Sequence, residues 1–158
     1  MASPLVVHRS RSYPMAVEES FAAVLVAPLP AVFAHRYGPI AAIRSVSGQE
    51  GPWGTAGQTR TIHLGDGATM RETLTSVDTP TAFRYDIGDL TGQLRLLISR
   101  VEGSWSFEPH GTGVRITWAW TVHPVGSAAA LAMPVLGRLW QGYARLALDT
   151  LETIVLPR

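Results

Sequence analysis

The sequence predicts an α+β fold in which antiparallel strands precede a long amphipathic helix near the C-terminus. Two patterns carry this prediction. Residues 105–122 alternate between apolar and polar side chains, which is the period of a strand with one buried face. Residues 127–156 repeat apolar side chains every three or four positions, which is the period of a helix with one buried face. The 158 residues suffice for one domain with a substantial core.

The composition excludes several kinds of site. The chain has no cysteine and no lysine, and its 13 basic side chains are all arginine. Disulfides, thiolate catalysis and lysine Schiff bases are therefore excluded. A net charge of +1 gives no basic surface for nucleic acid. The five histidines are scattered without the i, i+4 spacing of a metal site, so we expect neither a metal nor a cofactor.

Two apolar stretches resemble targeting or membrane segments only superficially. Residues 21–27 follow Glu18 and Glu19, whereas a signal peptide places a basic region before its apolar run. Residues 125–137 are too few to span a bilayer and include Pro134. We expect a cytoplasmic protein without stable membrane insertion, present as a monomer or homodimer.

The N-terminal region gives weaker signals than the rest of the chain. Residues 1–13 are predicted to form a flexible arm, which leaves 14–158 as a single domain. A strand is predicted over 15–27. Helix follows, because Pro28 and Pro30 suit a first helical turn. Gly38-Pro39 ends it, and a second short helix is expected beyond.

The remaining strands are separated by turn residues. Gly65-Asp66-Gly67 and Thr79-Pro80 supply tight turns, and Gly103 is expected to bend the longest strand. Residues 51–57 form a glycine-rich loop that lacks the Gly-Lys-Ser/Thr of a phosphate loop. The predicted strands are 44–50, 58–64, 69–77, 81–88, 93–108 and 112–122.

Hairpin geometry predicts how the aromatic strands pair. Placing Glu108 opposite Gly113 sets apolar side chains against one another, whereas a shift of one residue would place them on opposite faces. The resulting pairs are Phe107–Val114, Trp105–Ile116 and Val101–Trp120.

The hairpin at Thr79-Pro80 brings a carboxylate to the apolar face. A two-residue turn there predicts three pairs, Phe83–Ser76, Tyr85–Leu74 and Ile87–Glu72. Glu72 would then share a face with apolar side chains, which is unusual for an acidic residue.

Two turns are possible in the preceding hairpin. A two-residue Asp66-Gly67 turn would place Thr61 opposite Glu72 and turn His63 inward. A three-residue loop with Gly67 in a left-handed conformation would place Arg60 opposite Glu72 and Ile62 opposite Met70. We favour the second, because it gives a buried carboxylate a cationic partner.

Residues 57–124 resemble the polyketide cyclase/dehydratase branch of the START-like, or Bet v 1-like, superfamily, also called SRPBCC. The segment GTGVRITWAWTVHP matches with Trp118 at the usual tryptophan, and the long C-terminal helix fits. Toward the N-terminus, Pro30 to Phe33 is one residue tighter than the usual motif. The segment GQTRTIHLGDGATMRETLTSVDTPTAFRYDIG carries the family's spacing through Gly57, Arg60, Gly67, Glu72, Asp78, Pro80 and Tyr85.

This resemblance implies a helix-grip fold. In that fold a curved antiparallel sheet of about seven strands wraps around the long C-terminal helix, and two short helices follow the first strand. Between sheet and helix such proteins usually hold a cavity for an apolar molecule, which the aromatic face would line. The candidate ligand-binding residues are Arg60, Glu72, Tyr85, Trp105, Phe107, Trp118, Trp120, Trp140 and Tyr143.

Each candidate also has a purely structural interpretation. Arg60 and Glu72 could orient a ligand carbonyl or hydroxyl, or could form an ion pair that only joins two strands. Tyr85 and Tyr143 could donate from the cavity wall or could belong to the core. The aromatic residues could likewise be core.

Three classes of function remain open. The first is binding or transport of a small hydrophobic ligand, either lipid-like or aromatic and polyketide-like. The second is a polyketide aromatase/cyclase or dehydratase, in which Arg60, Glu72 and Tyr85 would supply proton transfer and positioning. The third is a protein-interaction module. Fold resemblance alone does not choose among them.

Overall fold

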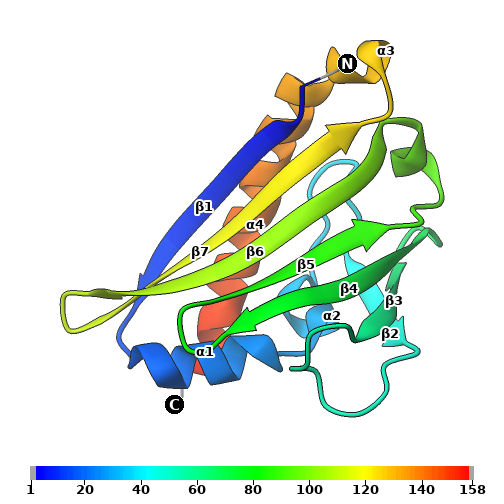
Figure 1. Cartoon of the computed structure of the whole chain (residues 1–158). Helices are drawn as coiled ribbons and strands as arrows, with labels where there is room; N and C mark the ends of the chain where they lie inside the picture. Colours follow the sequence, from blue (N-terminus) through cyan, green and yellow to red (C-terminus); the bar gives the residue numbers. More distant parts are fainter. Residues whose placement is uncertain (1–2, 157–158) are drawn as a thin grey trace.

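The computed structural model describes residues 3–156, and one curved sheet covers a long helix, α4 (Met133–Val155) (Figure 1). The strands are β1 (Leu5–Tyr13), β2 (Ile43–Ser47), β3 (Thr59–Leu64), β4 (Thr69–Asp78), β5 (Ala82–Gly88), β6 (Ile98–His110) and β7 (Gly113–Pro124). All neighbours pair antiparallel in the order β1-β7-β6-β5-β4-β3-β2. The two edges of the sheet are therefore β1 and β2.

Short helices complete the fold. Helix α1 (Val17–Leu25) and helix α2 (Leu29–Val32) follow β1, and both contact α4. They lie at one end of the space between sheet and helix (Figure 1). A 3₁₀ turn, η1 (Gln93–Leu96), precedes β6, and α3 (Ser127–Ala130) precedes α4. The predicted helix-grip fold is confirmed.

The predicted flexible arm over residues 1–13 is wrong, because Leu5–Tyr13 forms strand β1 along the whole of β7. Its inward side chains include cations that contact α4. Arg9 reaches Gln141, and Arg11 pairs with Asp149 and Glu152. The segment looks polar because this edge strand faces solvent on one side and the polar flank of a helix on the other. Residues 1–2 lie outside the described range.

The predicted strand over 15–27 is also wrong, because this segment contains helix α1. Ser20, Phe21 and Val24 are its buried residues, and they share one helical face. Glu18 and Glu19 stand in its first turn, where a negative charge stabilises a helix. The second short helix predicted directly after Gly38-Pro39 is also absent from the described residues before β2, where Tyr37 and Ile40 instead form an isolated bridge.

The β6–β7 hairpin pairs two residues away from the predicted register. Its pairs are Phe107–Ile116, Trp105–Trp118 and Val101–Val122. The strands continue to His110 and Gly113, so only two residues form the turn, with Gly111 at a φ of +58°. A shift of two residues leaves every side chain on its predicted face, because the strand period is two.

The hairpins around β4 follow the prediction more closely. Arg60 lies opposite Glu72 and Ile62 opposite Met70, with Gly67 at a φ of +90°. His63 bonds to Ser47 on the other face. The predicted pairs Tyr85–Leu74 and Ile87–Glu72 are confirmed, but Phe83 lies opposite Val77 rather than Ser76, because the ladder is irregular between Leu74 and Ser76.

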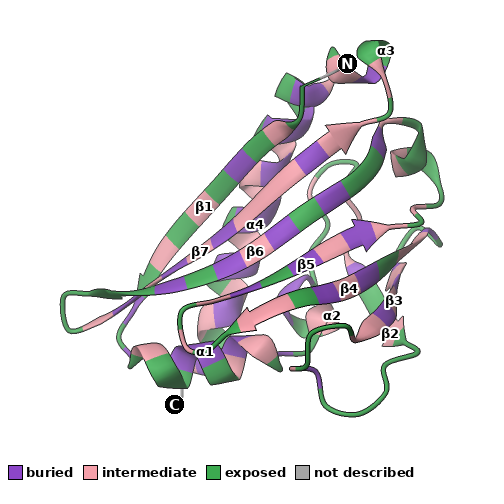
Figure 2. Cartoon of the chain, in the orientation of Figure 1, coloured by how far each residue is buried: buried purple, intermediate pink, exposed green. Residues whose placement is uncertain are grey.

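The core lies between the inner face of the sheet and one stripe of α4. Buried and exposed residues alternate along the strands (Figure 2). The predicted helix over 127–156 is divided into α3 and α4, with Pro134 in the first turn of α4. The apolar stripe expected on this helix is buried except for Ile154, which is 37% exposed, whereas the adjacent Val155 is buried. The buried members of the stripe are Leu136, Trp140, Tyr143, Ala147 and Leu151. None of the described helices is long and apolar enough to cross a bilayer.

Candidate functional site

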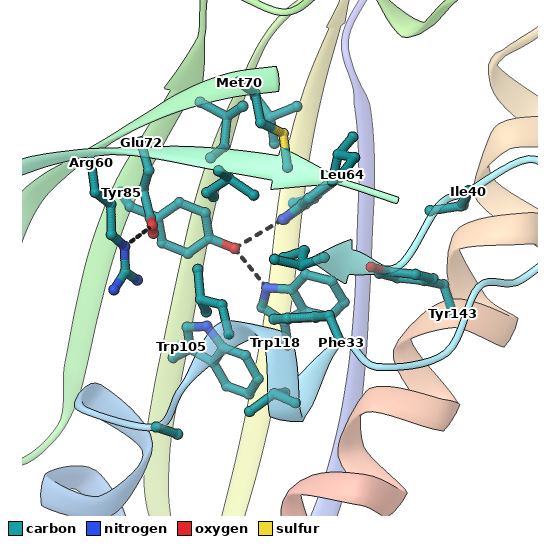
Figure 3. Close-up of a pocket in the computed structure, with 18 of the residues that line it drawn as sticks. Phe33, Ile40, Arg60, Leu64, Met70, Glu72, Tyr85, Trp105, Trp118 and Tyr143 are labelled. Atoms are coloured by element: carbon teal, nitrogen blue, oxygen red, sulfur yellow. Dashed lines mark hydrogen bonds and ion pairs between the residues drawn. The ribbon is translucent and has the colours of Figure 1, made fainter. Parts of the chain in front are cut away.

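A cavity of about 80 Å³ lies between the sheet and α4. Its wall is largely apolar, with side chains from β3 to β7, both N-terminal helices and α4 (Figure 3). The cavity is therefore a place where a small apolar molecule can be removed from water.

The Arg60–Glu72 pair forms a charged part of this wall. Arg60 Nε donates to Glu72 Oε1 at 2.6 Å, and both side chains are buried. Arg60 Nη1 donates to Gln49 Oε1 at 3.2 Å, and the guanidinium lies 3.8 Å from the centre of the Trp53 ring. Three contacts thus hold the arginine at the cavity wall, two of them from the loop before β3.

The surroundings of Glu72 change its acidity. Burial raises the pKa of its carboxyl above the ordinary value, and the nearby positive charge of Arg60 opposes the rise only in part. Glu72 therefore holds a proton at higher pH than an exposed glutamate does. A carboxyl with that property inside an apolar cavity can exchange a proton with a bound molecule.

Tyr85 forms the second polar feature of the wall. Its hydroxyl oxygen accepts hydrogen bonds from Trp118 Nε1 at 2.7 Å and from Trp120 Nε1 at 2.9 Å (Figure 3). Burial raises the pKa of this hydroxyl, so it stays protonated in the physiological range. The two indoles fix the position of the oxygen within the cavity wall.

A glycine makes the position of Tyr85 possible. Gly103 lies opposite Tyr85 in the β5–β6 ladder and opposite Trp120 in the β6–β7 ladder. A Cβ at Gly103 would lie 2.1 Å from Tyr85 Cζ, which is far inside van der Waals contact. The tyrosine ring therefore crosses over β6 to reach the indoles of β7. Sequence reasoning assigned this glycine to a bend and missed its packing role.

Tyr143 and Phe33 form the wall on the side of the helices. Their rings stack at 5.7 Å between centroids, with 11° between the planes. The Tyr143 hydroxyl donates to the carbonyl oxygen of Ala41 at 3.1 Å, and burial raises its pKa. Phe33 also packs on Trp118, with centroids 5.1 Å apart. The aromatic rings of sheet and helices thus form one continuous surface.

A sequence model of the family described as "Polyketide cyclase / dehydrase and lipid transport" matches residues 14–155. The chain belongs to this family. The match covers most of the chain, and it agrees with the resemblance found in the sequence. No curated protein matches the sequence.

Solved structures show which other proteins share this family member's fold. Ara h 8.0201 is 21% identical, with a TM-score of 0.72 over 96% of this chain and 97% of that one. Major latex-like protein 151 from Panax ginseng is 12% identical, with a TM-score of 0.72 over 98% and 99%. The di-domain ARO/CYC BexL from the BE-7585A biosynthetic pathway is 16% identical, with a TM-score of 0.70. That alignment covers 100% of this chain and 52% of BexL.

The family member's cavity contains most of the predicted ligand-binding residues. Phe107 and Trp140 are buried but are absent from the wall. Phe107 packs on Phe21 of α1 with ring centroids 5.3 Å apart, and Trp140 packs on Trp118 with centroids 4.7 Å apart, so both belong to the core. The predicted residues that line the cavity are Arg60, Glu72, Tyr85, Trp105, Trp118, Trp120 and Tyr143.

Sequence reasoning missed two residues that position Arg60. Trp53 and Gln49 lie in or beside the glycine-rich loop 51–57, whose composition predicts only a loop without a phosphate-binding motif. A tryptophan between prolines and glycines is a weak indication of packing, because it is large and apolar in an otherwise small, polar segment. Within residues 3–156, no three His, Asp or Glu side chains gather as metal ligands.

Proposed function

We propose that this protein binds a small, predominantly apolar molecule in the cavity between the sheet and α4. The observation that carries the proposal is a cavity with a largely apolar wall that includes a fixed ion pair and a fixed tyrosine hydroxyl. Burying an apolar ligand there would gain about 25 cal/mol for each Å² removed from water. The few polar groups would orient the ligand.

The cavity volume limits the ligand to a compact molecule. A cavity of this size suits a molecule of one or two fused rings better than a long acyl chain. A second, more open hollow is lined by the loop segments 34–42, 65–68 and 91–93, and it shares Ala41 with the cavity. These loops are the proposed entrance, since Ala41 lines both the hollow and the cavity.

Dye binding tests the proposal directly. An environment-sensitive naphthalene sulfonate dye should bind with one-to-one stoichiometry and quench tryptophan emission, because Trp105 and Trp118 line the cavity. Ala41→Phe adds bulk at the cavity wall and should weaken dye binding at least tenfold. Ala22→Phe adds the same bulk on the exposed face of α1 and serves as the matched control.

Equal dye binding by the wild type and Ala41→Phe would contradict binding in the cavity. Native mass spectrometry of the purified chain provides a second measurement. A bound small molecule should be retained by the wild type and by Ala22→Phe, and should be lost from Ala41→Phe.

A second candidate is an aromatase/cyclase, favoured by the carboxyl of Glu72 inside the cavity. With its pKa raised, Glu72 would be a stronger base than an exposed glutamate and could remove a proton next to a substrate carbonyl. A poly-β-keto thioester incubated with the wild type should then give a cyclised product by mass spectrometry. Glu72→Gln should abolish the product but retain dye binding, and no product above background would exclude this activity for that substrate.

A further inference from the structure

We infer that the bound molecule carries a hydrogen-bond acceptor, such as a ketone or ether oxygen, that receives the proton of the Tyr85 hydroxyl. The inference rests on the proposed ligand-binding function and narrows it to a chemical class. It follows from the hydrogen bonds already made at Tyr85.

A tyrosine hydroxyl can donate one hydrogen bond and accept two. Both accepting positions at Tyr85 are occupied by the indole nitrogens of Trp118 and Trp120. The direction of these bonds is certain, because an indole nitrogen carries a hydrogen and only donates. The one hydrogen-bonding position left on the Tyr85 oxygen is therefore that of its own proton.

That proton has no acceptor among residues 3–156, because the hydrogen bonds made at the Tyr85 oxygen there are the two that the indoles donate. Tyr85 is only 7% exposed and lines the cavity. A buried donor without an acceptor costs free energy, which a ligand oxygen would recover on binding. Turning the hydroxyl cannot help, since its other two directions face N–H groups.

The hydroxyl of Tyr143, which also lines the cavity, can offer a ligand an acceptor but no proton. Tyr143 gives its proton to the carbonyl oxygen of Ala41, so its oxygen can only accept from a ligand. Arg60 is held by Glu72, Gln49 and the ring of Trp53. Tyr85 thus presents an uncharged donor at a fixed position on the sheet side of the wall, where Trp105 also contributes an indole N–H (Figure 3).

Two ligands of the same shape separate this inference from simple apolar binding. Acetophenone has a ketone oxygen where α-methylstyrene has a CH₂ group. Each is titrated into the ¹⁵N-labelled full chain while the indole N–H signals of the five tryptophans are followed. We expect acetophenone to bind about three- to tenfold more tightly than the hydrocarbon, the gain from one net hydrogen bond. The Trp118 and Trp120 signals should shift most.

Tyr85→Phe should bring the ratio of the two dissociation constants close to one. Trp120→Phe keeps the hydroxyl but frees one accepting position on its oxygen. We expect that variant to retain the preference for the ketone and to bind 1-phenylethanol at least threefold more tightly, relative to the ketone, than the wild type does. This second variant keeps the inference testable if Tyr85→Phe does not fold.

The outcomes separate the two proposals. Equal binding of ketone and hydrocarbon by the wild type would overturn the inference and leave the cavity as a binding site. A ketone preference that persists in Tyr85→Phe would also overturn it, since Arg60 or an indole would then be the donor. If the dye, the ketone and the hydrocarbon all fail to bind, the proposed function itself is wrong.

Discussion

At the scale of single residues, Arg60 and Glu72 are two charged side chains that are buried away from water. The side chains of Arg60 and Glu72 are 9% and 6% exposed. An ion pair in such a place need not add net stability, because both charges lose their water. Losing one partner is different, since the remaining charge stays buried and unpaired. The stability of the fold therefore depends on keeping the pair intact.

Glu72→Ala should lower the free energy of unfolding at neutral pH by about 3–5 kcal/mol, because it leaves the Arg60 charge buried beside Trp53 without a carboxylate. Urea denaturation measures the change. The matched control is Glu108→Ala, which removes an exposed glutamate 3.8 Å from Arg115 and should cost no more than about 0.5 kcal/mol. Similar losses in both variants would contradict this account of the pair.

The acidity of Glu72 predicts a pH dependence. Because its pKa is raised in the folded chain, the folded state binds this proton more tightly than the unfolded state does. Its contribution to stability is present at low pH and is lost as pH rises from about 4.5 through the folded pKa. Glu72→Gln cannot titrate. As pH rises through that range, the wild type should therefore lose unfolding free energy relative to Glu72→Gln. Denaturation at a series of pH values measures it, and the opposite trend would show that the pKa is lowered.

At the scale of elements, strand β6 contributes to the cavity wall through Gly103, which has no side chain and so leaves room for the Tyr85 ring. Gly103 lets the Tyr85 ring cross from β5 toward β7, and the adjacent strands supply everything the ring bonds to. Two aromatic residues of helix α4 differ in their role. Tyr143 lines the cavity, whereas Trp140, one turn earlier, packs on Trp118 in the core. A position on a strand or helix thus decides whether an aromatic residue lines the cavity or fills the core.

Gly103→Ala should destabilise the fold by about 1–3 kcal/mol, because the new Cβ overlaps the Tyr85 ring. It should also shift the indole N–H signals of Trp118 and Trp120. Gly88→Ala on β5 is the matched control, since nothing lies within 4 Å of a Cβ there. An unchanged spectrum and melting temperature for Gly103→Ala would contradict the packing role.

Trp140→Leu should lower the unfolding free energy by at least about 2 kcal/mol, because it removes core volume against Trp118. Its affinity for acetophenone should stay close to that of the wild type, since Trp140 does not line the cavity. Tyr143→Phe loses only the bond to the Ala41 carbonyl and should cost about 0.5–1.5 kcal/mol. If Trp140→Leu weakens ligand binding more than Tyr143→Phe does, the division along α4 is wrong.

At the scale of the whole molecule, sheet, helices and loops enclose a space that no single element defines. A ligand that binds only the folded state at a hundredfold excess over Kd adds about 2.7 kcal/mol of stability. For a chain of this size we expect a rise in Tm of roughly 5–10 °C. Calorimetry with and without saturating acetophenone measures this. Ala22→Phe should show the same rise, and Ala41→Phe should show little; an equal rise in both would place the ligand elsewhere.

The sequence by itself determined which side chains share a face, because the periods of strand and helix are local properties of the backbone. It also favoured the Arg60–Glu72 pair over the alternative register, because a three-residue loop with Gly67 gives the carboxylate a cationic partner, and the structure has that pair. For the same reason the β6–β7 hairpin could be two residues out of register and still present Trp105 and Trp118 inward.

Only the tertiary structure decided the features that join distant parts of the chain. Strand β1 is polar by sequence and becomes a strand because β7 and the polar flank of α4 give it partners. Trp53 stacks on Arg60 only once the loop before β3 folds over the sheet. The two indole bonds to Tyr85 require β5, β6 and β7 to be in register. Such contacts depend on where the chain returns in space, and local periodicity carries no information about that.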